Sequence, residues 1–398
     1  MALSVLTKIP PAYLRREERL LHLWKRIAYN PKNPANSVYE TELSLTTEYK
    51  KTPFVVTTKR LLEEIGIDKD SMIKLNFPIT LEHKQIDIDT SLTKLISKKQ
   101  STNEEMLAIT KNHLNTRYPD RAQIYTDGSK KDDRSACAYT CELDDKYEHY
   151  RISDHTAIMT AELTALDKAF QHAILDHQNE AVVIITDSLS SAQSCLEPDN
   201  RKTARPDIVE SIYNRHNWLV KRNTKLTILW APSHINLRGN DIADSLANSG
   251  LQRDWINEPT KLGPLEIASI IKKHMKNKFQ IEWDKYEKAL LFKAIKPTIE
   301  GKIEVSFKEQ EINRLRLNVP AFHLPRNNIC ETCQRPLTPD HVLLNCFLFD
   351  QERELVRIEL EKIGLTFTVT NILHPDRKGI CKNKIHEFIE SIHKTYRI

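Results

Sequence analysis

The stretch Trp230-Ala-Pro-Ser-His-Ile-Asn-Leu-Arg-Gly-Asn-Asp-Ile-Ala-Asp244 decides how this chain folds. It places His234 ten positions before Asp244, across a glycine turn that opens into a helix. Asp241 and Asp244 are three apart, so their carboxylates share one face of that helix. The apolar run Leu226–Trp230 precedes the stretch and is typical of a buried strand. The sequence therefore predicts a strand, a loop that bears His234, and a helix that bears Asp244.

Three earlier segments each supply one more carboxylate. Asp127 and Asp187 each end a short, β-branched apolar run, which is the pattern of a buried strand with a carboxylate at its carboxyl end. Glu162 precedes an apolar stripe at helical spacing, which predicts a helix with Glu162 near its amino-terminal turn. An isolated aspartate at a strand end is commonly a turn or capping residue. The joint occurrence of these carboxylates favours a shared metal site.

Carboxylates that converge on one point repel one another and raise their own pKa values unless a cation compensates them. A hard divalent ion with oxygen ligands is the physical answer, and Mg²⁺ suits a site of few carboxylates plus water and phosphate. Mn²⁺ is the alternative ion. Two such ions hold both the attacking and the leaving oxygen of an in-line phosphoryl displacement. The chemistry predicted is cleavage of a phosphodiester by metal-activated water.

Taken together, the motifs around these carboxylates resemble a type 1 ribonuclease H domain, over a segment from Arg121 to about Leu251. The resemblance implies an α/β fold, with a five-stranded mixed sheet and flanking helices, between mainly helical amino- and carboxyl-terminal regions. It also implies hydrolysis of the RNA strand of RNA/DNA hybrids with two metal ions. The metal-binding set that it implies is Asp127, Glu162, Asp187 and Asp244. His234 would assist proton transfer or product release, although an isolated histidine is more often structural.

Four positions beside these motifs are predicted to contact the substrate: Ser129, Lys130, Ser188 and Asn240. Ser129 and Lys130 follow Asp127, where such residues commonly serve turn chemistry. They also suit a hydrogen bond to phosphate or to the 2′-hydroxyl by which a protein distinguishes RNA from DNA. Where members of the family usually carry glycine, this chain has Ser135-Ala136-Cys137-Ala138 in its second expected strand.

Composition narrows the classes of function further. The chain has 398 residues, a formal net charge of +5 and only 8 glycines. A typical glycine share is roughly 7%, so glycine-rich phosphate cradles are excluded. No apolar run reaches the roughly 18 residues of a membrane span, and no secretory signal begins the chain. We expect an intracellular protein that is not secreted and has no membrane partner, while nuclear and cytoplasmic locations stay open.

Residues 1–118 form the expected amino-terminal region. Ala12–Ile27 predicts an amphipathic helix, and the stretch from Leu81 to Leu114 is interpreted as polar and irregular, before a linker at Asn115–Asp120. The start of the chain resembles the segment that follows the polymerase core in non-LTR retrotransposon proteins. The polymerase signature of an aromatic residue, any residue and two aspartates is absent from the sequence, so we expect no DNA synthesis.

Residues 259–398 form the expected carboxyl-terminal region, which begins with a helical hairpin. The spacing Cys-x2-Cys-x7-His-x4-Cys supplies four ligands of the types that zinc prefers: Cys330, Cys333, His341 and Cys346. Free buried thiols are the alternative. The motif and its flanks resemble the zinc-bearing tail of the same retrotransposon proteins. Lys384–Tyr396 predicts a final helix docked on the zinc region, and Cys141 is interpreted as a packing residue, as are Cys137, Cys195 and Cys381.

The sequence thus supports two hypotheses from different classes. The first is a retroelement-derived, metal-dependent endoribonuclease that acts on RNA/DNA hybrids in a ribonuclease H domain at 121–251. The second is a non-catalytic remnant that binds hybrid or other nucleic acid. A nuclease needs magnesium for turnover, whereas a binder shows only the salt dependence of its phosphate contacts. Fragment, domesticated protein and relic are alternatives that the sequence leaves open.

Overall fold

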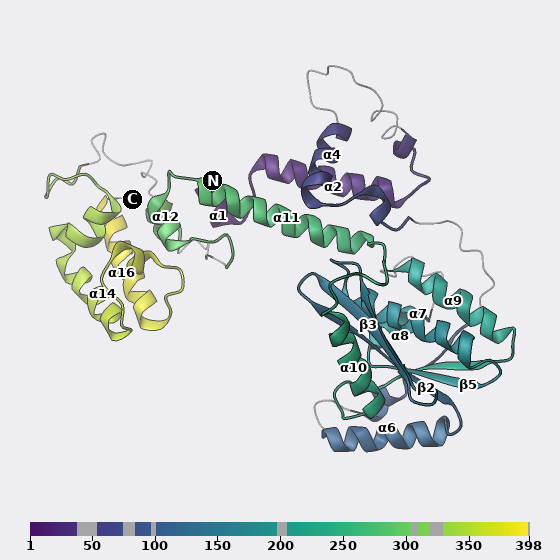
Figure 1. Cartoon of the computed structure of the whole chain (residues 1–398). Coiled ribbons are helices and arrows are strands. Elements are labelled where there is room, and N and C mark those ends of the chain that lie inside the picture. The colour runs from purple at the N-terminus through teal and green to yellow at the C-terminus, as the bar shows by residue number, and fades with distance from the viewer. Residues whose placement is uncertain are drawn as a thin grey trace. The chain divides into compact units, whose positions relative to one another are not determined.

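The computed structural model describes residues 1–37, 54–74, 84–96, 101–196, 205–301, 303, 309–317 and 329–396. The chain divides into two compact units (Figure 1). One unit comprises residues 20–272, and the other comprises residues 1–19 with residues 273–398. Within the described ranges, no helix has the length and apolar character needed to cross a membrane.

A mixed sheet forms the centre of the first unit, and its strands lie in the order β1-β6-β5-β2-β3-β4. The strands are β1 (Asp87–Asp89), β2 (Ala122–Lys131), β3 (Arg134–Cys141), β4 (Lys146–Ile152), β5 (Ala181–Thr186) and β6 (Lys225–Trp230). β2, β3 and β4 form an antiparallel meander, while β2, β5, β6 and β1 are parallel. The five expected strands are present, and the short β1 adds a sixth beside β6.

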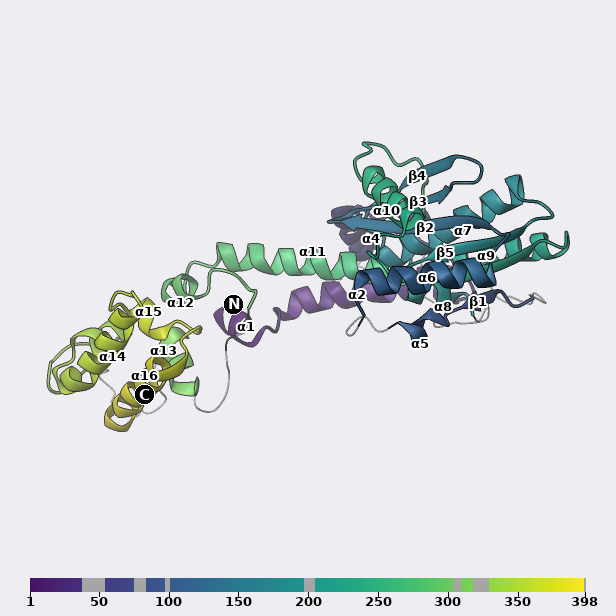
Figure 2. The same ribbon diagram turned by 90° about the horizontal axis from the view of Figure 1, so that it is seen from below.

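Helices cover both faces of this sheet because the side chains of β2 alternate between two apolar clusters. Ile124 packs in the cluster that contains Leu163 of α7, whereas Tyr125 packs in the cluster that contains Leu114 of α6. Figure 2 shows α6 and α7 on opposite sides of the sheet. The helices concerned are α6 (Asn103–Arg117), α7 (Ile158–Asp176), α8 (Leu189–Ser194), α9 (Pro206–Val220) and α10 (Arg238–Gly250). α7 is the central helix, and its residues from Thr160 to Leu166 are all buried.

The expectation of an irregular stretch and a linker before β2 is wrong for the part that the structure describes. Residues 103–117 form α6, which begins with a capping box between Thr102 and Glu105. The sequence of α6 is mostly polar, and only a few of its residues are buried, among them Met106 and Leu114. Contact with the sheet stabilises this helix. In the sequence, α5 (Leu92–Leu95) lies between β1 and α6.

The amino-terminal helix is confirmed. α2 (Ala12–Tyr29) buries Leu14, Leu21 and Trp24, which belong to the apolar face predicted for it. α1 (Ala2–Thr7) precedes it, and α4 (Phe54–Ile65) and the short turn η1 (Lys69–Ser71) follow it.

A single long helix, α11 (Pro264–Lys285), replaces the expected hairpin after the sheet domain. Its Glu266 is only 4% exposed and accepts hydrogen bonds from the Ala157 backbone N–H (2.6 Å) and the Thr160 hydroxyl (2.6 Å). Arg205 lies 3.6 Å from the same carboxylate. Glu266 therefore caps the amino terminus of α7, the helix that carries Glu162.

The second unit is helical around the cysteine motif. It contains α12 (Leu290–Ile295), α13 (Gln310–Leu317), a wide turn η3 (His341–Asn345), η4 (Phe347–Phe349), α14 (Asp350–Lys362), α15 (Val369–Leu373) and α16 (Gly379–Tyr396). Phe388 of α16 belongs to the same apolar cluster as Cys330 and Cys346. The predicted docking of the last helix on this region is confirmed.

Candidate active site and metal centres

The first two site carboxylates come from neighbouring parallel strands. Thr126 of β2 lies opposite Thr186 of β5, so the next residues, Asp127 and Asp187, fall side by side. The indole N–H of Trp230 donates to the backbone carbonyl of Asp187 over 3.0 Å and anchors the end of β5. Asp187 directly follows β5, as the sequence predicted. The expectation that Asp127 also ends its strand is wrong, because β2 continues to Lys131 through its antiparallel pairing with β3.

The third carboxylate reaches the strands because α7 lies unusually close to β2. A Cβ atom at Gly128 would lie 2.6 Å from the backbone nitrogen of Glu162 and 3.0 Å from its carboxyl carbon, Cδ. Only glycine leaves room for this approach. Oxygens of Asp127, Glu162 and Asp187 all lie within 4.8 Å of one another.

The electrostatics of this group favour the binding of a cation. Burial raises the pKa of Asp127 to about 8, and the nearby charges of Asp187 and Asp244 add to the shift. Burial likewise raises the pKa of Glu162 well above its ordinary value, with further contributions from Asp127 and Asp187. Within the described part of the chain, the buried Oε2 of Glu162 has no hydrogen-bond partner. Clustered, buried and unsatisfied carboxylate oxygens fit a hard divalent ion.

Asp244 stands next to this group rather than inside it. It projects from α10, and its Oδ1 accepts a hydrogen bond from the side-chain amide of Asn248 over 2.9 Å. Burial is the main cause of the raised pKa of both Asp127 and Asp241, and the charge of Asp244 raises both pKa values further. Three of the four predicted ligands are therefore assembled tightly, and the fourth is their electrostatic neighbour.

His234 is exposed on the loop between β6 and α10. Its backbone has a φ of 57°, a left-handed conformation, and its carbonyl accepts a hydrogen bond from Asn103 over 3.2 Å. Its charge lowers the pKa of Asp241, which opposes the rise caused by burial. The imidazole is thus accessible to solvent beside the acidic helix α10.

The predicted substrate residues are mostly engaged within the protein. Three of them hydrogen-bond internally: Ser129 donates to Asn248 (2.7 Å), the Lys130 ammonium donates to the Thr156 carbonyl, and the Ser188 and Ser191 hydroxyls share a bond (2.7 Å). Asn240 is only 3% exposed. Their contact with a substrate stays a prediction, and it would require these side chains to exchange partners.

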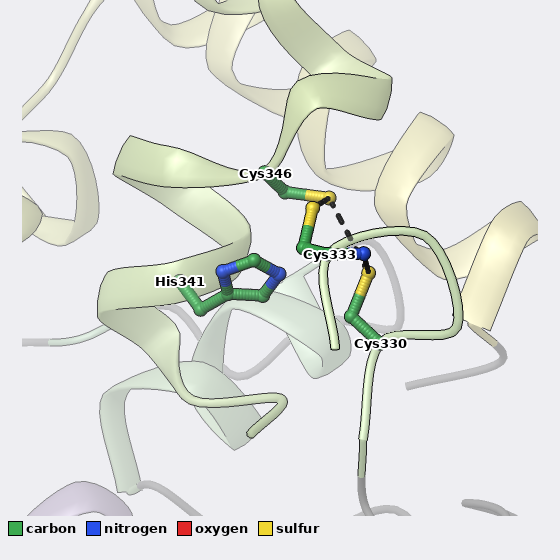
Figure 3. A group of neighbouring side chains, drawn as sticks. All are labelled: Cys330, Cys333, His341 and Cys346. Atoms are coloured by element: carbon green, nitrogen blue, oxygen red, sulfur yellow. Dashed lines mark hydrogen bonds between the residues drawn. The ribbon is translucent and has the colours of Figure 1, made fainter. Parts of the chain in front are cut away.

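The cysteine motif forms a second compact group of donors. Figure 3 shows the side chains of Cys330, Cys333, His341 and Cys346 gathered at one point, and their donor atoms lie within 4.8 Å of one another. A tight turn presents the first two thiols, because Gln334 adopts a φ of 52° and its N–H donates to the Cys330 carbonyl over 2.8 Å.

The chemistry of this second group suits zinc. Both ring nitrogens of His341 are buried and, among the described residues, neither has a hydrogen-bond partner. Burial disfavours the Cys330 thiolate, but contacts with the Tyr396 hydroxyl and with the backbone N–H of Cys333 lower its pKa below the ordinary value. An imidazole without a partner beside a readily ionised thiol is what a tetrahedral zinc site requires.

A third group of donors was missed by the sequence analysis: Cys141, Asp144, His172 and His177. Cys141 was assigned to packing because no neighbouring cysteine has metal-ligand spacing. The sequence did contain a signal for this group. Two residues separate Cys141 from Asp144 and four separate His172 from His177, a spacing similar to that of a zinc finger with aspartate in place of one cysteine.

Comparison with known proteins identifies the domain that carries the carboxylates. Residues 119–252 match the family model described as RNase H. The chain therefore contains an RNase H domain. Most of the mixed sheet and most of its flanking helices make up this domain. No curated protein matches the chain.

Solved structures similar to this chain include two enzymes named RNase H1. That of the archaeon Halobacterium salinarum is 22% identical, with 33% of this chain and 97% of the other covered and a TM-score of 0.26. That isolated from compost is 18% identical, with 33% and 99% covered and a TM-score of 0.26. The prototype foamy virus protease-reverse transcriptase is 23% identical, with 34% of this chain but only 21% of the viral protein covered and a TM-score of 0.27.

Proposed function

We propose that this chain is a metal-dependent endoribonuclease that hydrolyses the RNA strand of RNA/DNA hybrids. The observation that carries the proposal is the group Asp127, Glu162 and Asp187, whose oxygens lie within 4.8 Å of one another inside the segment that matches RNase H, with Asp127 and Glu162 buried. Such a group is unfavourable without a cation, as the pKa of about 8 for Asp127 illustrates. A protein that only bound a phosphate backbone would gain nothing from it.

The proposed roles follow from chemistry at each position. Asp127, Glu162 and Asp187 would hold divalent ions, Mg²⁺ or Mn²⁺, and Asp244 would complete the set from α10. Two bound ions would supply an activated water and would stabilise the departing 3′ oxygen. His234, whose imidazole is exposed, would move a proton or assist product release.

We also propose that the chain derives from a retroelement and that its cysteine motif holds a structural zinc ion. The buried, unpartnered imidazole of His341 among three thiols supports the zinc assignment. Four protein ligands leave no open position, so this ion would stabilise the carboxyl-terminal unit rather than take part in hydrolysis.

The test is cleavage of an end-labelled RNA/DNA hybrid by the full chain in magnesium. We expect hybrid-specific cutting that leaves 5′-phosphate and 3′-hydroxyl ends, with no cutting of duplex DNA or single-stranded RNA. Asp187→Asn should abolish it, because a neutral amide replaces a ligand between two other carboxylates. Asp254→Asn is the matched control, since Asp254 is an exposed carboxylate outside the group.

Two results would contradict the proposal. One is an intact chain that binds the hybrid but leaves it whole across magnesium and manganese concentrations, which identifies a non-catalytic nucleic-acid-binding protein. The other is cleavage that persists unchanged in Asp187→Asn, which would trace the activity to another site or to a contaminating nuclease.

A further inference from the structure

The end of the β3–β4 hairpin and the carboxyl end of α7 bring four metal-binding side chains together. Cys141 is the last residue of β3, and Asp144 lies in the turn before β4. His172 lies in the last turns of α7, and His177 follows the helix directly. Their donor atoms all lie within 4.8 Å of one another. Two local segments, separated in sequence, thus supply two ligands each.

We propose that these four side chains form a structural zinc site within the RNase H domain: Cys141, Asp144, His172 and His177. Zinc bonds of about 2.0–2.3 Å in a tetrahedron place ligand atoms roughly 3.3–3.8 Å apart. Asp144 Oδ2 lies 2.9 Å from His172 Nε2 and 3.2 Å from His177 Nε2, and Cys141 Sγ lies 3.6 Å from His177 Nε2. Small side-chain rotations convert these distances into a tetrahedral site.

The hydrogen bonding of the group independently points to a ligand at its centre. Both oxygens of Asp144 and the Nε2 of His172 are buried, and within the described ranges none has a partner in hydrogen-bonding geometry. The side chain of His172 is only 2% exposed. Buried polar atoms are almost always satisfied by protein, water or an ion. An ion at the centre would satisfy all three of these atoms together.

The outer nitrogens of both histidines are held as zinc ligands usually are. His172 Nδ1 lies 2.9 Å from Asp176 Oδ2, and His177 Nδ1 lies 2.8 Å from Glu180 Oε2. A carboxylate that accepts from the outer N–H fixes the tautomer and directs the lone pair of Nε2 towards a metal. In both histidines the Nε2 atoms face Asp144, which is the arrangement that such a zinc site requires.

The geometry assigns this site a structural role. Four protein ligands complete a tetrahedron and leave no position for substrate. Zinc here would join the β3–β4 hairpin to α7, ten residues and about 15 Å along the helix from Glu162. It would therefore stabilise the helix that positions a catalytic carboxylate without contacting the carboxylate group itself.

The test measures zinc binding by the full chain, by metal analysis after dialysis and by competition with a chromophoric chelator. We expect zinc in addition to the amount held by the carboxyl-terminal cysteine motif. Asp176→Asn removes one outer carboxylate and should weaken one zinc site by 10–100-fold while the other is unchanged. Asp133→Asn is the matched control, because it breaks a similar carboxylate–histidine pair, with His155 at 3.1 Å, outside the group.

A second pair of variants tests the thiol ligand. Cys141→Ser should lower the zinc content by one ion per chain and remove one thiolate-to-metal band from the cobalt-substituted protein. Cys195→Ser, at another buried cysteine of the same domain, should change neither. Equal zinc content and affinity in wild type, Asp176→Asn and Cys141→Ser would overturn the proposal. Should Cys141→Ser unfold, Asp176→Asn still decides, because the Asp176 side chain is 43% exposed and its replacement spares the core.

Discussion

Asp127→Asn should change how the stability of the metal-free chain depends on pH. A carboxyl with an unfolded pKa of about 3.9 and a folded pKa of about 8 keeps its proton in the folded state while the unfolded state loses it. Between these values the folded state binds one more proton, so the free energy of unfolding falls as pH rises. The slope for one proton is about 1.4 kcal/mol per pH unit.

The assay is urea denaturation in chelator at several values from pH 4 to 8. Wild type should lose stability along this range relative to Asp127→Asn, in which a neutral amide cannot titrate. Magnesium should stabilise wild type increasingly as pH rises, because the ion binds the ionised carboxylates, and should stabilise the variant less. Asp254→Asn, at an exposed carboxylate, should follow wild type in both conditions.

Parallel pH profiles for wild type and Asp127→Asn in chelator would refute the reasoning. They would mean that Asp127 is as ionised in the folded chain as in the unfolded one, so that the carboxylate group has no need of a cation. A magnesium effect of equal size in both proteins would lead to the same conclusion. The measurement is independent of whether the chain has nuclease activity.

Gly128→Ala should cost about 1–3 kcal/mol and reduce hybrid cleavage, because the new Cβ would lie 2.6 Å from the Glu162 backbone nitrogen and force α7 outward; unchanged stability and activity would contradict this. Glu266→Ala should destabilise the RNase H domain by about 3 kcal/mol in urea denaturation, since it leaves the Ala157 N–H and the buried Thr160 hydroxyl without their acceptor and removes the carboxylate beside Arg205; a loss below 1 kcal/mol would speak against the capping role. Cys330→Ser should make the carboxyl-terminal unit susceptible to proteolysis while the RNase H domain stays resistant, and equal resistance of both units in wild type and variant would contradict the structural role of the cysteine motif.

Local patterns in the sequence were sufficient wherever the relevant residues are close together along the chain. The short apolar runs before Asp127 and Asp187 correctly predicted two buried strands, β2 and β5, whose parallel pairing places the two aspartates side by side. Cys330, Cys333 and His341 lie within a dozen positions, so one turn and one helical segment bring their side chains together. The prediction of zinc followed from the spacing of the cysteine motif, and the family followed from the resemblance of the carboxylate motifs to ribonuclease H.

Other features depended on contacts between distant segments, which no local pattern encodes. α6 has too weak an apolar stripe to be recognised, and it becomes a helix because the sheet buries Met106 and Leu114. Glu266 lies beyond the segment that matches RNase H, yet it caps α7 inside it.

The sequence by itself determined the class of the domain, through the resemblance of its short motifs to ribonuclease H, and it also determined the candidate acidic residues and the cysteine motif of the tail, because each rests on neighbouring residues. Tertiary structure alone decided that the close approach at Gly128 brings Glu162 to Asp127 and Asp187. It also decided that Cys141 meets His172, because a hairpin had to fold against the end of a helix 31 positions further along the chain. Folding converts such long separations into contacts, and it does so through the packing of whole elements.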